Sequence, residues 1–350
     1  MATAHATCDI PSLRGDASSV QTRPGDPRLI DRFGRVATAL RISLTDRCNL
    51  RCSYCVPPEG LQWLADERVL TDTEVIRLIT IAVRDLGVEL IRFTGGEPLL
   101  RRGLERILAS TTELRTASGS VPQVVLSTNG LGLTHRAAKL KAAGLQRIVV
   151  SLDTLDRSRF ARITGRDRLD DVMSGLDAAA DAGLTPIKVN SVLIRGVNDD
   201  EAVPLVRWAL GRGYRPAFIE QIPRDLRGAR DQDQMITVAE ILAKLQAELD
   251  LAPADPTSRF PELAETWIVS GATVSDPVLR TVGIVASVTR ASCGDCDRTR
   301  LTADGQLRNC LFARHETDLR SLLRAGASDA ELALAWRGDA WAKKAVRGID

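Results

Sequence analysis

The sequence lacks any apolar run that approaches the roughly 20 residues of a transmembrane helix. It also lacks the hydrophobic core of a secretory signal peptide near its first residue, so we expect a cytoplasmic protein. Neither sign of charge is in excess, because 47 Lys and Arg are matched by 45 Asp and Glu, which gives a net charge of +2. This balance gives no electrostatic reason to expect a nucleic acid or a membrane as a partner.

A disulfide framework is missing as well. The seven cysteines comprise Cys8, alone in a polar segment, and two triplets. A reducing compartment leaves such thiols free to bind metal. We therefore expect two metal sites, formed by Cys48, Cys52 and Cys55 and by Cys293, Cys296 and Cys310.

The chain of 350 residues is long enough for one large domain or two ordinary ones. Residues 1–33 are rich in Ala, Ser, Pro and Gly and are expected to form a disordered leader. A change of composition after Pro223 divides the remainder into a barrel domain at 34–224 and a C-terminal region at 225–350.

Strand and helix patterns alternate through the first of these domains. Apolar runs predict strands at 41–44, 90–93, 124–126, 148–150, 187–189 and 216–219. Amphipathic runs predict helices at 71–86, 134–143, 169–182 and 201–210. The C-terminal region is expected to contain a helix at 237–249, a loop at 252–259, strands at 266–269 and 281–288, and helix from 321 onward. Six alternating units predict an α/β fold with a partial, laterally open (β/α)6 TIM-like barrel, followed by an α+β region.

The unusual residues follow the predicted strands, each at the point where a strand ends. They are the cysteine loop 48–55, the segment 94–98, the segment 127–130, Ser151 and Asp153, Lys188 and Asn190, and the segment 220–222. Because the carboxyl ends of the strands carry the active sites of β/α barrels, we expect these residues to meet in one site.

The first triplet is spaced Cys48-x3-Cys52-x2-Cys55. Thiolates are soft ligands that suit iron or zinc. A structural zinc site is closed by four protein ligands, whereas three cysteines leave a coordination position open. A zinc loop or three unrelated thiols are the alternatives.

This spacing, with Tyr54 before the last cysteine, is similar to the signature of radical S-adenosylmethionine (SAM) enzymes. The longer segment 41–57, RISLTDRCNLRCSYCVP, resembles the MoaA family of GTP 3′,8-cyclases of molybdenum cofactor biosynthesis. The resemblance implies a 4Fe–4S cluster on the first triplet, whose open iron binds SAM and releases a 5′-deoxyadenosyl radical. It also implies SAM contacts at Tyr54, Gly96, Glu97, Ser151 and Ile222.

Two of these contacts have a simpler alternative explanation, and a third departs from the family pattern. Ser151 on its own is typical of a turn or helix cap, and the glycine pair before Glu97 is a common turn signal. Ile222 stands where the family usually has methionine, so its contact with SAM is expected through the backbone.

The second triplet has the spacing Cys293-x2-Cys296-x13-Cys310, which matches the same family. The resemblance implies a second 4Fe–4S cluster in the C-terminal region, whose free iron binds the guanine of GTP. A zinc knuckle completed by His315 is the alternative.

Arg298 and Arg300 lie two positions apart in an extended segment, so their side chains share a face and suit phosphate recognition. A structural salt bridge is the alternative for Arg41 and Lys188, since unpaired charge is costly in a buried strand. The resemblance implies Arg41 as the catalytic residue that steers the radical intermediate. It implies GTP-binding residues at Arg41, Arg92, Ser127, Lys188, Arg298, Thr299 and Arg300.

The implied activity is that of a lyase that converts GTP to 3′,8-cyclo-7,8-dihydro-GTP. The implied partners are a downstream cyclic pyranopterin monophosphate synthase, a reductant such as flavodoxin or ferredoxin, and a second copy in a homodimer. The family closes with a Gly-Gly tail, whereas this chain ends in Arg-Gly-Ile-Asp at 347–350. The alternatives are a peptide-modifying radical SAM enzyme with an auxiliary cluster, or a truncated cyclase copy of weak or no activity.

Overall fold

A computed structural model describes most of the chain. Its described residues are 25–56, 60, 62–222, 234–255, 264–271, 279–313 and 315–345. Cys8, residues 1–24 of the predicted leader, the boundary at 224 and the tail at 347–350 lie outside them. The last part of the predicted leader is folded, because Leu29 is 1% exposed in the core and Ile30 pairs with Val36.

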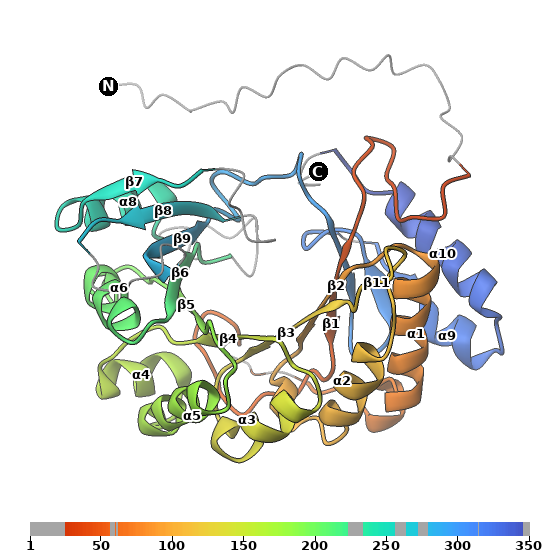
Figure 1. Ribbon diagram of the computed structural model, residues 1–350, viewed down its shortest axis with the longest axis horizontal. Helices are drawn as coiled ribbons and strands as arrows, with labels where there is room; N and C mark the ends of the chain where they lie inside the picture. Colours follow the sequence, from red (N-terminus) through yellow and green to blue (C-terminus); the bar gives the residue numbers. More distant parts are fainter. Residues whose placement is uncertain are drawn as a thin grey trace.

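Six parallel strands form the centre of one curved sheet (Figure 1). They are β1 (Ala39–Ser43), β2 (Leu90–Thr94), β3 (Gln123–Thr128), β4 (Arg147–Ser151), β5 (Lys188–Val192) and β6 (Arg215–Ile219). They lie in the sheet in chain order, which confirms the predicted six-unit partial barrel.

Helices cover the convex face of this sheet (Figure 1). They are α1 (Asp72–Asp85), α2 (Leu104–Thr112), α3 (Leu133–Ala142), α4 (Arg157–Thr164), α5 (Leu169–Asp181) and α6 (Ala202–Gly211), with 3-10 turns η1 (Asp66–Arg68) and η2 (Pro98–Leu100). Helix α1 begins at a capping box in which Thr71 and Glu74 satisfy each other's backbone N–H groups. The helices predicted at 71–86, 134–143, 169–182 and 201–210 are confirmed to within one residue at each end. The helix predicted at 237–249 ends three residues early, and the helix predicted from 321 onward is divided in two.

The C-terminal strands extend both edges of the central sheet. Strand β10 (Arg298–Leu301) pairs in parallel with β1, and β9 (Thr281–Val285) pairs in parallel with β6. The outer strands are antiparallel: β8 (Glu265–Val269) and β7 (Leu251–Pro253) beyond β9, and β11 (Gln306–Arg308) and β12 (Thr317–Asp318) beyond β10. The loop predicted at 252–259 is wrong at its start, because β7 pairs with β8.

Three further helices belong to the C-terminal region: α8 (Val238–Gln246), α9 (Leu319–Arg324) and α10 (Asp329–Trp341). Figure 1 shows α9 and α10 beside α1, on the same side of the sheet. Trp336 of α10 is fully buried, and its Nε1 donates a hydrogen bond of 3.0 Å to Oγ1 of Thr299 in β10. This contact fixes which face of β10 points toward the helices.

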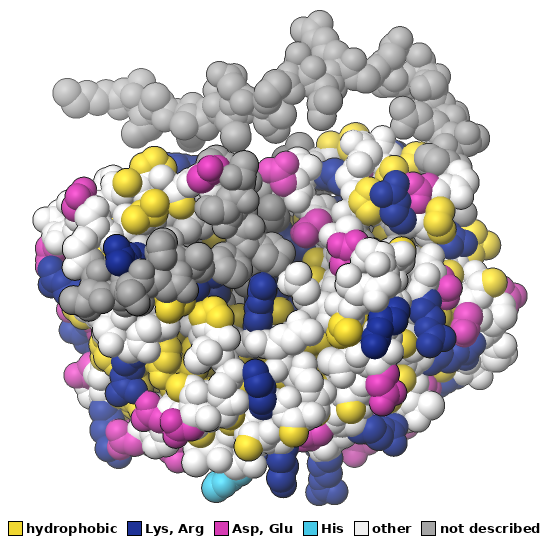
Figure 2. All heavy atoms as spheres, in the orientation of Figure 1, with side chains coloured by type: hydrophobic (Ala, Val, Ile, Leu, Met, Phe, Trp, Pro, Cys, Tyr) yellow, Lys and Arg dark blue, Asp and Glu magenta, His cyan; other side chains and the backbone are white. Residues whose placement is uncertain are grey.

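The strands alternate between an apolar helix-facing side and a polar inner side. Leu40 and Ile42 are fully buried among the helices, whereas Arg41 between them is directed to the inner side. Figure 2 shows basic and acidic side chains interspersed over the visible surface of the molecule. Of the helices that the structure describes, none combines the length and the apolar character needed to cross a bilayer.

Candidate active site

Basic residues line the inner face of the sheet. Arg41 lies opposite Arg92 of β2 on one side and opposite Arg300 of β10 on the other. Residues paired in parallel strands share a face, so the three guanidinium groups are directed to the same side. Arg298 joins them two positions before Arg300. Lys188 lies on the same inner face farther round the barrel, but it is the first residue of β5, so its predicted position at the end of that strand is wrong. The structure thus brings together the basic residues that the sequence predicted.

Burial and mutual repulsion disfavour the charged forms of these residues. Burial, followed by the nearby Arg92, Arg298 and Arg300, lowers the pKa of Arg41. Burial and Arg298 lower the pKa of Arg92 to about 10. Burial and the neighbouring cations Arg92, Arg215 and Arg41 also lower the pKa of Lys188. A bound polyanion removes this repulsion, so the arrangement is suited to a phosphorylated ligand.

Two arginine nitrogen atoms strengthen this interpretation. Nε of Arg298 and Nη1 of Arg300 are buried and have no hydrogen-bond partner among the described residues. Burial and Arg298 lower the pKa of Arg300 to about 10, while the nearby Cys296 and Cys310 act in the opposite direction. Because buried donors are normally satisfied, the unfilled positions fit the oxygen atoms of a phosphate.

Sequence analysis missed two basic residues of the inner face. Arg147 opens β4 opposite Val125, whose other neighbour is Arg92, and Arg215 opens β6 opposite Lys188. Burial and Arg92 lower the pKa of Arg147. The signal that could have identified both was a basic residue at the inner-facing position of an otherwise apolar strand.

Small polar residues follow the basic ones toward the carboxyl ends of the strands. Nη1 of Arg92 lies 3.5 Å from Oγ of Ser127, so two predicted GTP-binding residues are in contact. Ser151 is exposed at the end of β4 and pairs in register with Asn190. Ile222 is half-buried, three residues beyond the last residue of β6.

Thr299 does not belong to this inner face. Its neighbours Arg298 and Arg300 point inward, so its own side chain points outward, where it is 2% exposed and bonded to Trp336. The Thr299 side chain faces the helices because it lies between two inward residues of the strand, so the predicted contact of Thr299 with GTP would have to come from its backbone.

The first cysteine triplet lies in the loop after β1. Backbone N–H groups of Arg51 and Ser53 donate to the carbonyls of Thr164 and Ile163 at the end of α4, which anchors the loop. The Tyr54 hydroxyl donates a 2.6 Å hydrogen bond to Oδ2 of buried Asp153, beyond β4. Tyr54, a predicted SAM contact, thus ties the loop to the end of β4, three strands away from β1 in the sheet.

The Cys48 thiol of this loop lies near uncharged hydrogen-bond donors. Sγ of Cys48 accepts from the backbone N–H of Leu50 at 3.4 Å, and Nδ2 of Asn129 lies 3.8 Å from it. Burial raises the pKa of both Cys48 and Cys52. A cationic metal centre would favour their thiolate forms.

The glycine pair after β2 permits a close approach of two backbones. A Cβ at Gly96 would lie 2.3 Å from the carbonyl oxygen of Arg47, and Gly95 has a φ of +149°. The N–H groups of Gly96 and Glu97 donate to the carbonyls of Thr45 and Arg47. The turn is therefore bonded directly to the segment that enters the cysteine loop.

The Glu97 carboxylate is held by neighbouring protein groups. Its carboxylate is fully buried and accepts from Leu99 N–H at 2.9 Å, Thr128 Oγ1 at 2.7 Å and Asn129 N–H at 2.7 Å. Burial outweighs these bonds and raises its pKa to about 7. Glu97 therefore organises the end of β3, and its predicted contact with SAM stays a prediction.

The second cysteine triplet lines a cavity of about 500 Å³ at the amino end of β10. Nζ of Lys343, after α10, donates to Sγ of Cys296 at 3.2 Å. Burial alone raises the pKa of Cys296, but Lys343 and Arg298 outweigh it and lower this pKa to about 7. His315 also lines the cavity. Over the described residues, no three His, Cys, Asp or Glu side chains are grouped closely enough to hold a single metal ion.

The two triplets lie at opposite ends of the paired strands β1 and β10. Cys48 follows the carboxyl end of β1, whereas Cys296 precedes the amino end of β10, with which β1 runs parallel. The pair Arg41 and Arg300 lies between them. Donor sets of three thiols, without carboxylates, suit iron–sulfur clusters.

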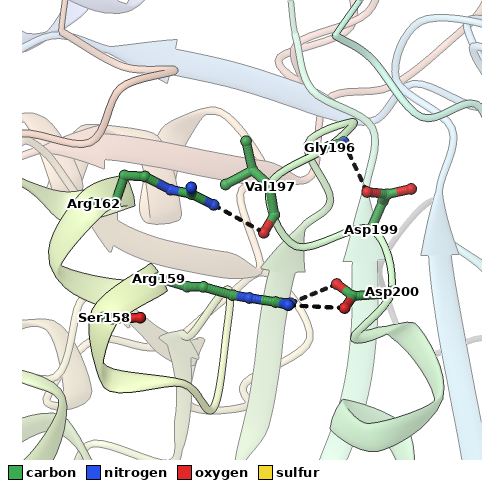
Figure 3. Close-up of a pocket in the computed structure, with 7 residues that line it drawn as sticks. All are labelled: Ser158, Arg159, Arg162, Gly196, Val197, Asp199 and Asp200. Carbon is green, nitrogen blue, oxygen red and sulfur yellow. Dashed lines mark hydrogen bonds and ion pairs between the residues drawn. The ribbon is translucent and has the colours of Figure 1, made fainter.

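A further pocket lies on the outside of the barrel, between α4 and the loop after β5 (Figure 3). Its arginines are bonded within the protein: Arg159 pairs with Asp200, and Arg162 donates to the Val197 carbonyl. The predicted site residues do not line it.

Comparison with known proteins defines the class first. Residues 42–209 match the radical SAM superfamily, and residues 215–348 match the family described as Molybdenum Cofactor Synthesis C. Streptococcus suis SuiB bound to S-adenosylmethionine aligns with a TM-score of 0.53 at 14% identity, over 83% of this chain and 66% of SuiB. The fold is therefore that of a radical SAM protein, a superfamily that uses a 4Fe–4S cluster and SAM.

Curated relatives define the family. A GTP 3′,8-cyclase of Streptomyces coelicolor is 53% identical over 97% of this chain and 95% of its own length. A GTP 3′,8-cyclase of Corynebacterium glutamicum is 52% identical over 93% of this chain and 86% of its own length. The chain belongs to the GTP 3′,8-cyclase family.

Proposed function

We propose that this chain converts GTP to 3′,8-cyclo-7,8-dihydro-GTP, the first step of molybdenum cofactor biosynthesis. The observation that carries the proposal is the row of basic residues on the inner face, between two groups of three thiols. Membership in the cyclase family supports the same reaction.

Cys48, Cys52 and Cys55 would hold the first cluster, which supplies the electron that cleaves SAM when both are bound. Backbone groups near Gly96, with Tyr54, Ser151 and Ile222, would surround SAM. Glu97 and Asp153 would hold the residues around SAM in position, because each carboxylate is buried and bonded to protein groups.

Cys293, Cys296 and Cys310 would hold a second cluster, near which the guanine base of GTP is bound. The proximity of Arg300 to Cys296 and Cys310 supports this placement, since the charges of these thiols influence its pKa. The residues around Arg300 would then contact both the guanine base and the phosphates of GTP.

The triphosphate would bind Arg41, Arg92, Lys188, Arg298 and Arg300, with Ser127 beside Arg92. Bidentate guanidinium contacts fix an anion in orientation as well as in position. Arg41 occupies the centre of this row, so we assign it the steering of the reacting ribose and base.

We further propose that the chain works as a cytoplasmic homodimer, where thiols stay reduced. A flavodoxin or ferredoxin would supply electrons, and a cyclic pyranopterin monophosphate synthase would consume the product. We also propose a domain boundary near 224, although β9 and β10 of the C-terminal region join the barrel sheet.

Anaerobic turnover tests the proposal. The reconstituted chain is incubated with GTP, SAM and a reductant, and 5′-deoxyadenosine and the cyclised nucleotide are measured together. Equal formation of both is expected, and Cys48→Ala serves as the control that forms neither. SAM cleavage without cyclised GTP would reject the cyclase, and two clusters without SAM cleavage would indicate an inactive copy.

A further inference from the structure

Lys343 is a buried lysine at the second cysteine group. Its side chain is 6% exposed, two residues beyond the end of α10. Nζ donates to three acceptors: the Cys296 carbonyl at 3.1 Å, Cys296 Sγ at 3.2 Å and the Arg298 carbonyl at 3.2 Å. All three ammonium protons are therefore directed at the start of β10.

The positive charge of Lys343 has no carboxylate in contact with it. Within the described ranges, Lys343 forms no ion pair with an Asp or Glu, although Asp339 lies one turn earlier in the same cavity wall. A buried ammonium is costly unless an opposite charge compensates it. Cys296 Sγ is therefore the group that can bring negative charge into contact with Nζ, while the Asp339 carboxylate acts on Lys343 electrostatically without an ion-pair contact.

The charge of Arg35, a second cation near the same cysteines, is compensated by a carboxylate. Nη1 of Arg35 donates to the Cys293 carbonyl at 2.6 Å, while its Nε pairs with Asp31 at 2.5 Å. Arg35 thus brings its own carboxylate, whereas Lys343 does not. At the first cysteine group, the donors to Cys48 Sγ are the neutral groups of Leu50 and Asn129.

We propose that Lys343 is a positioning residue for the second iron–sulfur cluster: its ammonium holds Cys296 Sγ and raises the reduction potential of that cluster. This inference rests on the proposed function, since it requires the second cluster to exist. Hydrogen bonds to ligand sulfur atoms and nearby positive charge both stabilise the reduced cluster, which is one electron more negative.

Substitutions at Lys343 separate its charge from its hydrogen bond. Lys343→Met removes both, Lys343→Gln keeps a neutral donor, and Lys343→Arg keeps the charge. Each is made in the full chain carrying Cys48→Ala, Cys52→Ala and Cys55→Ala, so that only the second group can bind a cluster. Lys139→Met, an exposed residue of α3, is the matched control.

The measurement is an anaerobic redox titration followed by electron paramagnetic resonance. We expect a more negative midpoint potential in the Met and Gln variants, with the larger shift in Met, and a value near the parent in the Arg variant. Loss of iron from Met and Gln, but not from Arg, gives the same assignment, because the retained charge then holds the ligand.

Iron content distinguishes a failure of the proposed function from a failure of the role proposed for Lys343. If the parent chain with three alanines binds no iron, the second cluster is absent and the proposed function fails together with this inference. If it binds a cluster whose potential is the same in the Met, Gln and Lys139→Met variants, only the role of Lys343 is overturned.

Discussion

Arg41 and Arg300 occupy paired positions in the neighbouring parallel strands β1 and β10, although 259 positions separate them in the sequence (300 − 41). The pairing directs both guanidinium groups to the inner face and leaves Nη1 of Arg300 without a partner among the described residues. Residues from the barrel and from the C-terminal region therefore contribute to one anion site.

Removal of the Arg300 charge should weaken binding of the triphosphate. Arg300→Met is expected to raise the dissociation constant for GTP by about 10- to 100-fold, since a charged hydrogen bond contributes roughly 1.5–3 kcal/mol. Anaerobic calorimetry of the reconstituted chain measures this change. The exposed Lys139→Met variant should bind GTP normally, and an unchanged affinity for Arg300→Met would exclude Arg300 from the site.

Cys310→Ala should separate the two ligands. The substitution removes one thiol of the second group but leaves the loop at 48–55 intact. SAM binding is expected to persist while GTP binding is lost, which equilibrium dialysis of both ligands can measure. Retention of full GTP affinity would show that the second cysteine group does not bind the substrate.

Gly96→Ala should disturb the first cluster selectively. The added Cβ would lie 2.3 Å from a backbone oxygen of Arg47, which leads into the cysteine loop. Iron and labile sulfide should fall from about eight to about four per chain. Gly211→Ala, at the end of α6 with no atom within 4 Å of the new Cβ, is the control and should keep all its iron.

Asp339 should make stability depend on pH. Burial raises its pKa from 3.8 to about 6, so the folded state prefers the protonated carboxyl. Stability from this group is present below pH 3.8 and is lost as pH rises through about 6. Asp339→Asn should therefore raise the free energy of unfolding at pH 7 by about 2–3 kcal/mol.

The effect of Asp339→Asn should vanish near pH 3.5, where both chains carry a neutral group. Chemical denaturation of the metal-free chain at several pH values measures it. The exposed Asp85→Asn variant should follow the parent at every pH. A difference between Asp339→Asn and the parent that does not change with pH would contradict the titration.

Trp336 should be important for the attachment of α10 to the sheet. Trp336→Ala is expected to lower the free energy of unfolding by about 3–5 kcal/mol, because it leaves a cavity and the unbonded hydroxyl of Thr299. Leu334→Ala, at a 52% exposed position of the same helix, should cost less than about 0.5 kcal/mol. Equal losses in the two variants would show that the buried contact is not what attaches α10.

The sequence predicted the features that depend on local pattern. Strand and helix alternation, both cysteine triplets and the shared face of Arg298 and Arg300 follow from spacing, and the structure bears out the six-unit barrel. The residues of a family motif do not all direct their side chains to the same site. The side chain of Thr299 points away from Arg298 and Arg300, because side chains alternate between the two faces of a strand.

Features made by distant partners could not be predicted. The pairing of β10 with β1, the three bonds of Glu97 to the end of β3, and the contact of Lys343 with Cys296 each join segments with no common local signal. Local propensity does not specify which sheet edge an added strand will occupy.

The positions of β9 and β10 bear on how the chain folds during synthesis. Until residues 281–301 have left the ribosome, β1 and β6 would present bare backbone N–H and C=O groups on both sides of the nascent barrel. Such edges pair readily with other chains. A fragment that stops after β6 should consequently aggregate, and the family's two conserved-looking segments should be expressed as one polypeptide rather than as separate pieces.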